Sequence, residues 1–220
     1  HDVDHQGVSN FQLAKEKDSM AIAYENKSVL EQHSFDLAWS LLTESKYKDL
    51  RNAIYSTQEE YDRFRQLSVN CVLATDIFDK DMKSFRDSRW EKAFKSDSSG
   101  DNNNNAITRI DDNEDWNRKA TITIECIIQA SDVAHTMQHW HVYQRWNLCL
   151  FKEMHQAFME GRSDKDPALG WYDGELWFFD NYIIPLAKKL RECEVFGVSC
   201  DEFLDFATEN RKEWSVKGRD

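Results

Sequence analysis

Apolar residues recur every three to four positions along most of the chain, which is the period of an amphipathic helix. Two such stretches open with a capping box, Ser28-Val29-Leu30-Glu31 and Thr57-Gln58-Glu59-Glu60, a pattern typical of a helix start. The first predicts a helix to about residue 42 and the second a helix running toward Asp76. Further helices are predicted at about 121–133, 137–159, 170–190 and 200–214, the third of them bent at Pro185.

The predicted helix 137–159 carries an apolar stripe on one side. Its members at helical spacing are Trp140, Tyr143, Trp146, Leu150 and Met154. Because such a stripe packs in a core more often than it lines a pocket, we expect most of this helix face to be buried.

Residues 96–115 interrupt the helical pattern with a run rich in Ser, Asp and Asn, and this polar loop predicts a solvated connection within one domain. Elsewhere the composition favours a globule, since 40% of the residues are hydrophobic and 13% aromatic. Only two prolines and seven glycines punctuate the 220 residues, which favours long helices over many short strands. We expect a mostly α-helical single domain over residues 1–220.

The charge and the cysteines narrow the function classes. A formal net charge of −12 argues against nucleic acid as a partner, because such binding depends on Lys and Arg at phosphates. Five cysteines, odd in number and without CxxC spacing, favour reduced thiols and a cytoplasmic location. The sequence has no apolar run long enough to span a bilayer and no signal peptide, so we expect no membrane contact from this segment.

The most chemically informative segment is the first, His1-Asp2-Val3-Asp4-His5-Gln6-Gly7. Imidazole nitrogens and carboxylate oxygens in this density suit a divalent cation, with Zn²⁺ and either Mg²⁺ or Mn²⁺ as candidates. A polar surface turn is the alternative. The chain starts inside this motif without an initiator Met, and we therefore expect it to be an N-terminally truncated piece of a longer protein.

In its motifs and their order the chain resembles the catalytic domain of the class I 3′,5′-cyclic nucleotide phosphodiesterases. The resemblance implies a compact all-α fold of many helices and metal-dependent hydrolysis of cAMP, cGMP or both to 5′-monophosphates. It also implies that regulatory or membrane-tethered modules are fused upstream. The motifs that carry it are His1 to Asn10 (HDVDHQGVSN), Ser28 to Glu31 (SVLE), Val72 to Asp76 (VLATD), Ser131-Asp132, Gly174 to Phe178 (GELWF) and Pro185-Leu186.

The resemblance implies a ligand set for two metals. His1, Asp2 and Asp132 match ligands of a tightly held Zn²⁺, and Asp2 also matches a carboxylate that bridges to a second metal, usually Mg²⁺. The residues His5, Glu31 and Thr75 match positions that hydrogen-bond to metal-bound waters. From the residues alone, a capping box accounts for Glu31 equally well, whereas a carboxylate after the apolar run that ends at Asp132 needs a partner.

A second group of residues matches the substrate pocket of the family. Glu175 stands where the family has a glutamine that bonds the purine edge, and an ionised glutamate only accepts hydrogen bonds. It would favour a donor edge, either the adenine amino group or guanine N1–H and N2–H₂. The other matches are Phe178 as the aromatic clamp, Leu150 and Met154 as apolar walls, for which core packing is the alternative, and His135 at the pocket edge.

The sequence contains a second histidine cluster, formed by His135, His139 and His141. We interpret it as surface or pocket-rim chemistry, because no acidic motif accompanies it. The family's upstream motif, with one more zinc-binding His and the His that protonates the leaving oxygen, is expected before residue 1. Two alternatives stay open: another metal phosphohydrolase of the His-Asp type, and a non-catalytic domain that binds cyclic nucleotide or regulates a fused module.

Overall fold

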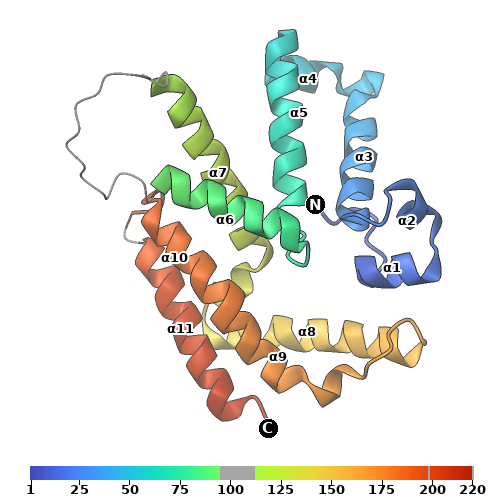
Figure 1. Ribbon diagram of the computed structural model, residues 1–220, viewed down its shortest axis with the longest axis vertical. Coiled ribbons are helices and arrows are strands. Elements are labelled where there is room, and N and C mark those ends of the chain that lie inside the picture. The colour runs from blue at the N-terminus through green and yellow to red at the C-terminus, as the bar shows by residue number, and fades with distance from the viewer. Residues whose placement is uncertain (95–111, 198, 220) are drawn as a thin grey trace.

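Helices make up all the regular structure of the described residues. The computed structural model describes residues 1–94, 112–197 and 199–219, and in these ranges it contains no strand, which confirms the predicted all-α class (Figure 1). Across the same ranges, no helix combines the length and the apolar character that crossing a bilayer demands. The α-helices are α1 (Asn10–Glu16), α2 (Ser19–Ala23), α3 (Val29–Thr43), α4 (Lys48–Ile54), α5 (Gln58–Leu73), α6 (Lys80–Phe94), α7 (Asp112–Asp132), α8 (Trp140–Met159), α9 (Trp171–Phe178), α10 (Ile184–Glu192) and α11 (Ser199–Lys217).

Two hydrophobic cores hold these helices. The larger one is formed by α6 to α11 and is centred on fully buried residues such as Tyr143, Phe179 and Ile183. A smaller one gathers Leu13 and Val29 with their neighbours on α1 to α3. Helix α5 packs against both α3 and α7, so it joins the two halves, and the N-terminus of the chain lies between them (Figure 1).

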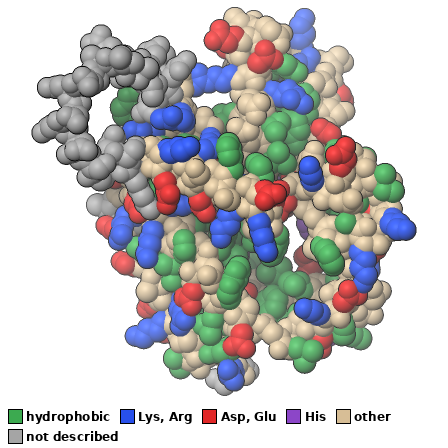
Figure 2. Space-filling model, viewed as in Figure 1, with side chains coloured by type: hydrophobic (Ala, Val, Ile, Leu, Met, Phe, Trp, Pro, Cys, Tyr) green, Lys and Arg blue, Asp and Glu red, His purple; other side chains and the backbone are tan. Residues whose placement is uncertain are grey.

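Salt bridges join the N-terminal segment to the loop that follows α8. Arg162 Nη2 lies 2.8 Å from Glu16 Oε2, and Lys15 Nζ lies 2.5 Å from Asp164 Oδ1. The guanidinium of Arg162 lowers the pKa of Glu16 to about 2, chiefly through its hydrogen bond. These salt bridges link α1 to the loop at the C-terminal end of α8. The face drawn in Figure 2 has a hollow between the α1–α3 side of the molecule and its C-terminal helices.

One of the two predicted capping boxes is present. The Thr57 hydroxyl accepts from the Glu60 backbone N–H, and the Glu60 carboxylate accepts from the Thr57 backbone N–H, as predicted. The box at Ser28 is wrong, although α3 does begin at the next residue. Ser28 has a left-handed φ of 38° and its hydroxyl bonds to Asp76 instead of capping the helix.

Several predicted boundaries shift in the structure. Helix α7 begins at Asp112, earlier than predicted, so residues 112–115 of the expected polar loop are helical and that part of the prediction is wrong. Residues 96–111 of that loop lie outside the described residues. Helix α8 begins at Trp140, because a 3₁₀ turn, Ala134–Met137, precedes it. Helix α11 confirms the last predicted helix.

The predicted helix 170–190 is divided where a bend was expected. Helix α9 ends at Phe178, a π-helical turn spans Phe179–Ile183, and α10 begins at Ile184 with Pro185 in its first turn. Proline lacks the N–H that would bond the carbonyl of Asn181 four residues earlier, and its ring crowds that carbonyl. The wider turn avoids this clash, which confirms Pro185 as the cause of the irregularity.

The prediction that the apolar stripe of α8 lies in the core is only partly right. Tyr143 is fully buried and Trp140 packs on the core, but Trp146 is 54% exposed and Leu150 and Met154 are each 44% exposed. The buried face of α8 instead continues from Tyr143 to Asn147, one turn further along. Core packing is therefore wrong for Leu150 and Met154.

Candidate metal centre and nucleotide site

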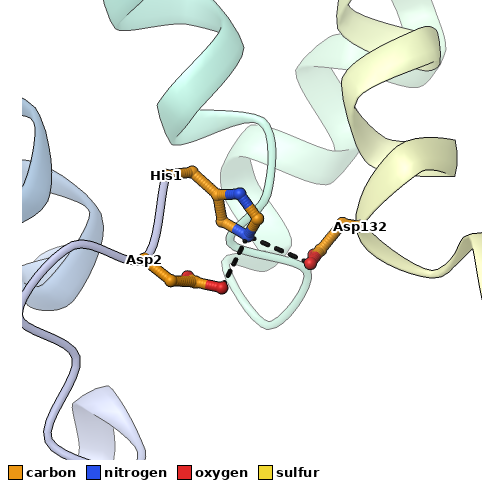
Figure 3. Close-up of side chains that lie close together, drawn as sticks. All are labelled: His1, Asp2 and Asp132. Carbon is orange, nitrogen blue, oxygen red and sulfur yellow. Dashed lines mark ion pairs between the residues drawn. The ribbon is translucent and has the colours of Figure 1, made fainter. Parts of the chain in front are cut away.

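Three side chains that the sequence assigned to a metal converge in the structure (Figure 3). His1 Nε2 lies 3.0 Å from Asp2 Oδ2 and 3.0 Å from Asp132 Oδ1. His1 and Asp2 precede α1, whereas Asp132 is the last residue of α7, so the fold brings together positions that are 130 residues apart. One ligand atom from each residue lies within 4.8 Å of the others.

The donor set of this cluster fits a divalent cation. The pKa of His1 is raised, first by its hydrogen bond to Asp132 and then by the negative charges of Asp132, Asp2 and Glu31, while burial lowers it. One imidazole nitrogen faces two carboxylate oxygens, although a single N–H donates well to only one of them. A cation among the three atoms would satisfy all of them, and nitrogen with carboxylate oxygen is a ligand combination that Zn²⁺ accepts.

A polar network lies beside this cluster and is centred on Asn10, the first residue of α1. Asn10 Nδ2 donates to Glu31 Oε2 at 2.9 Å and to Asp76 Oδ2 at 3.4 Å. Its Oδ1 accepts from the Leu30 backbone N–H at 2.9 Å. Glu31 is therefore bonded to α1 and not to the backbone of Ser28, which answers the alternative that a capping box explains it.

Asp76 completes the network from the end of α5. Its Oδ2 accepts from the Ser28 hydroxyl at 2.8 Å, and its Oδ1 accepts from the backbone N–H groups of Phe78 and Asp79. Asp76 is only 7% exposed. Burial, the largest influence, raises the pKa of Glu31, and the charge of Asp76 adds to this effect. A half-buried and a buried carboxylate therefore share one amide beside the cluster of His1, Asp2 and Asp132.

His5 and Thr75 are the other two residues predicted to hydrogen-bond to metal-bound waters. His5 Nδ1 accepts from the Gly7 backbone N–H at 3.0 Å, an arrangement that the φ of +70° at Gly7 permits. His5 lowers the pKa of Glu31 electrostatically, so the imidazole and the carboxylate are close. Thr75 is 7% exposed, and its hydroxyl donates to the Val72 carbonyl at 2.7 Å, directly before Asp76.

The residues predicted for the nucleotide lie on α8, on α9 and, for His135, in the 3₁₀ turn before α8. Tyr143 Oη donates to Glu175 Oε2 at 2.6 Å, and the ring of Phe178 stacks on Tyr182 with centroids 5.3 Å apart. The His135 ring is parallel to that of Tyr143, with centroids 6.4 Å apart. Burial lowers the pKa of His135 and the charge of Asp132 raises it, so this histidine lies near both Asp132 and Tyr143.

Sequence reasoning missed the residues that hold these groups in place. Asn10 and Asp76 were quoted within motifs but given no role, and Tyr143 was assigned only to the core. The signal for Asn10 and Asp76 is that each stands at a helix end beside a predicted site residue. For Tyr143 the signal is weaker, namely a buried hydroxyl that needs a partner.

The described residues combine an all-helical fold with a His/Asp cluster whose donor set fits a divalent cation, an arrangement that metal-dependent hydrolases use. Comparison with known proteins narrows this class. A family model described as 3′5′-cyclic nucleotide phosphodiesterase matches residues 1–194. The chain therefore belongs to the 3′,5′-cyclic nucleotide phosphodiesterase family, whose members are generally metal-dependent, and the resemblance drawn from the motifs is confirmed.

Curated relatives and a solved structure agree with this. The probable 3′,5′-cyclic-AMP phosphodiesterase pde-4 of Caenorhabditis elegans is 29% identical over 170 residues, and the dual specificity calcium/calmodulin-dependent 3′,5′-cyclic nucleotide phosphodiesterase 1B of Homo sapiens is 26% identical over 170 residues. Each alignment covers 77% of this chain but only 23% and 26% of the respective relative. The phosphodiesterase domain of the Salpingoeca rosetta rhodopsin phosphodiesterase shares the fold, with a TM-score of 0.71 at 22% identity over 98% of this chain and 62% of that one.

Proposed function

We propose that residues 1–220 form part of one catalytic domain that hydrolyses 3′,5′-cyclic nucleotides to 5′-monophosphates. The observation that carries the proposal is the convergence of His1, Asp2 and Asp132 within 4.8 Å, next to the carboxylate network of Glu31. The proposal includes Zn²⁺ with Mg²⁺ or Mn²⁺ as the metals, fused upstream modules and a cytoplasmic location.

The residues of the chain have distinct roles in this proposal. His1, Asp2 and Asp132 would hold the metals, which when bound neutralise the phosphate and supply an activated water. Glu31 directs Oε2 to Asn10, which leaves Oε1 to accept a proton or a hydrogen bond from water. Because His5 Nδ1 accepts from Gly7, its hydrogen is on Nε2, where it serves as a donor. The hydroxyl oxygen of Thr75 has lone pairs left to accept.

On the nucleotide side, the proposal assigns the base to the end of α8 and to α9. Phe178 and the exposed apolar side chains of Leu150 and Met154 would contact its faces, with Glu175 at its edge and His135 toward the phosphate. The exposure of Leu150 and Met154 supports contact with a ligand over packing in the core. Stacking between an aromatic ring and apolar side chains accepts either purine, so the edge contact decides the choice.

The test is product analysis with the natural full-length protein in the presence of Mg²⁺. We expect release of 5′-monophosphate from cAMP or cGMP, and we expect Asp132→Asn to lower both bound zinc and turnover by at least 100-fold, since it removes a charged ligand. Asp205→Asn, the same change on an exposed position of α11, should alter neither. Full metal content and turnover in Asp132→Asn would overturn the proposal. Nucleotide binding without turnover by the unchanged protein would instead favour a regulatory domain.

A further inference from the structure

Four charged side chains fasten α1 to the loop that follows α8. The Arg162 guanidinium bonds the Glu16 carboxylate at two points, Nε to Oε1 at 3.1 Å and Nη2 to Oε2 at 2.8 Å. Lys15 Nζ donates to both carboxylate oxygens of Asp164, at 2.5 and 2.6 Å. We call these four side chains the α1–α8 latch. It joins the half of the molecule built on the smaller core, α1 to α3, to the half built on the larger core.

The turn that ends α8 fixes the direction of Arg162. Gly161 has a φ of 76°, and its N–H donates to the Phe158 carbonyl. The N–H of Arg162 donates to the Ala157 carbonyl at 2.8 Å. These two bonds form a Schellman motif, in which a left-handed residue closes a helix. Since Ala157 also packs against the smaller core, the backbone that carries Arg162 is held close to α1.

The α1 side of the latch is also held. Gln12 Nε2 donates to Glu16 Oε1 at 2.7 Å, and Gln12 is buried, so the Glu16 carboxylate is oriented before Arg162 reaches it. Arg162 Nη2 lies in addition 3.4 Å from the side-chain oxygen of Gln6. Because Gln6 belongs to the motif that begins at His1, the latch extends to the segment that carries two of the metal ligands.

The metal ligands come from different halves. The segment of His1 and Asp2 is fastened to α3, where the Ser34 hydroxyl donates to the Val3 carbonyl at 2.8 Å. Asp132 instead ends α7, which is anchored in the larger core by residues such as Cys126. The separation of the three ligands therefore depends on how firmly the two halves are held together.

We propose that the α1–α8 latch positions the metal ligands, so that Arg162 and Lys15 raise the affinity of the His1, Asp2 and Asp132 cluster for zinc without touching the ion. A site shared between two bodies binds more weakly in proportion to the time the bodies spend apart. Ion pairs that are partly exposed are also screened by salt, so the latch makes zinc affinity sensitive to ionic strength. This inference rests on the metal site of the function proposed above.

The test is the zinc dissociation constant of the full-length protein, measured by competition with a chelating indicator. Arg162→Glu places a carboxylate against Glu16 and should raise the constant about 5-fold, as the closed fraction falls. The direction is diagnostic. Added negative charge would by simple attraction tighten the binding of a cation, whereas an opened latch weakens it. The exchanged pair, Arg162→Glu with Glu16→Arg, should return the constant to within about 2-fold of the unchanged protein, because a Glu–Arg pair forms again.

Arg211→Glu is the matched control. Arg211 bonds Asp180 with the same two-point geometry, at 2.9 and 2.8 Å, but both residues belong to the half built on the larger core. The control should not weaken zinc binding. In 1 M salt, where the Debye length is about 3 Å, the difference between Arg162→Glu and the unchanged protein should shrink by at least half.

The outcomes separate the latch from the function. A zinc dissociation constant in Arg162→Glu that equals that of the unchanged protein, with turnover retained, overturns the latch and leaves the proposed function standing. Equal weakening in Arg211→Glu, or no recovery in the exchanged pair, also overturns the latch, because the effect would then be one of general stability. An unchanged protein that binds no zinc overturns both.

Discussion

Substituting Asn10 by Ala removes the amide that joins α1, α3 and the end of α5. Three hydrogen bonds are lost, to Glu31 at 2.9 Å, to Asp76 at 3.4 Å and from the Leu30 N–H at 2.9 Å. The carboxylates of Glu31 and Asp76 differ in the hydrogen-bond donors that remain to them after this substitution. Asp76 retains three other donors, whereas Glu31 loses the side-chain donor through which it is held.

The magnitude follows from this difference. A hydrogen bond to a charged group contributes about 1.5–3 kcal/mol and a backbone bond to a neutral amide about 1 kcal/mol, while the 3.4 Å contact adds little. The free energy of unfolding should therefore fall by about 3 kcal/mol. For a domain of this size that corresponds to a Tm lower by roughly 6–12 °C.

The assay is urea unfolding at pH 7, followed by far-UV circular dichroism, with thermal unfolding in parallel. Asn181→Ala is the matched control, because Asn181 is exposed and its side chain donates to the Trp177 carbonyl one turn earlier in the chain, and it should change stability by less than about 0.5 kcal/mol. Asn10→Asp keeps the acceptor for Leu30 but replaces the donor by a third carboxylate, so it should be at least as destabilised. If Asn10→Ala is no less stable than Asn181→Ala, the network does not hold these elements together.

Three further predictions concern caps, titration and thiols. Thr57→Ala should lower the free energy of unfolding by about 1 kcal/mol in urea titrations, because it removes a helix cap that the structure confirms. The ion pair of Glu16 with Arg162 stabilises the fold above the ordinary carboxyl pKa near 4.5 and is lost as the pH falls toward about 2; in Arg162→Ala, NMR titration should find that the pKa of Glu16 rises toward 4.5. Burial raises the pKa of Cys126 to about 12, so a thiol reagent at pH 8 should label exposed Cys149 first and Cys126 only on unfolding, as mass spectrometry of peptides would show.

Each of these has a contrary outcome. A Thr57→Ala protein as stable as the parent would mean that the cap is replaced by water. A Glu16 pKa that stays near 2 without Arg162 would assign the shift to Gln12, which also donates to it. Rapid labelling of Cys126 in the folded protein would show that α7 opens readily.

The sequence predicted many of the helices, because the period of an amphipathic helix is a local signal. Helical spacing predicted the segments of α3, α5 and α7 to α11, but not α1, α2, α4 or α6. The family resemblance grouped Asp132 with His1 and Asp2, and the structure brings these three side chains together. The predictions that were wrong depend on contacts between residues far apart in the sequence. The hydroxyl of Ser28 has two candidate partners, and local sequence shows only the helix it precedes and not Asp76, 48 residues away.

Helix α8 illustrates the same limit. Periodicity shows that Tyr143, Leu150 and Met154 share a side, but not how far along the helix its neighbours extend. In the structure the packing partners cover Tyr143 and leave the later residues exposed. The hydrogen bond of buried Asn147 was equally out of reach, because its donor, the indole of Trp171, arrives from another helix.

The π-helical turn at Phe179–Ile183 sets the rotational phase between α9 and α10. It holds one residue more per turn than an α-helix, and each α-helical residue advances the chain by about 100°. Deleting one residue there would let the two helices merge and would swing Glu175 by about that angle relative to buried Leu186. The direction in which Glu175 points would then depend on the residue count of the π-helical turn that follows its helix.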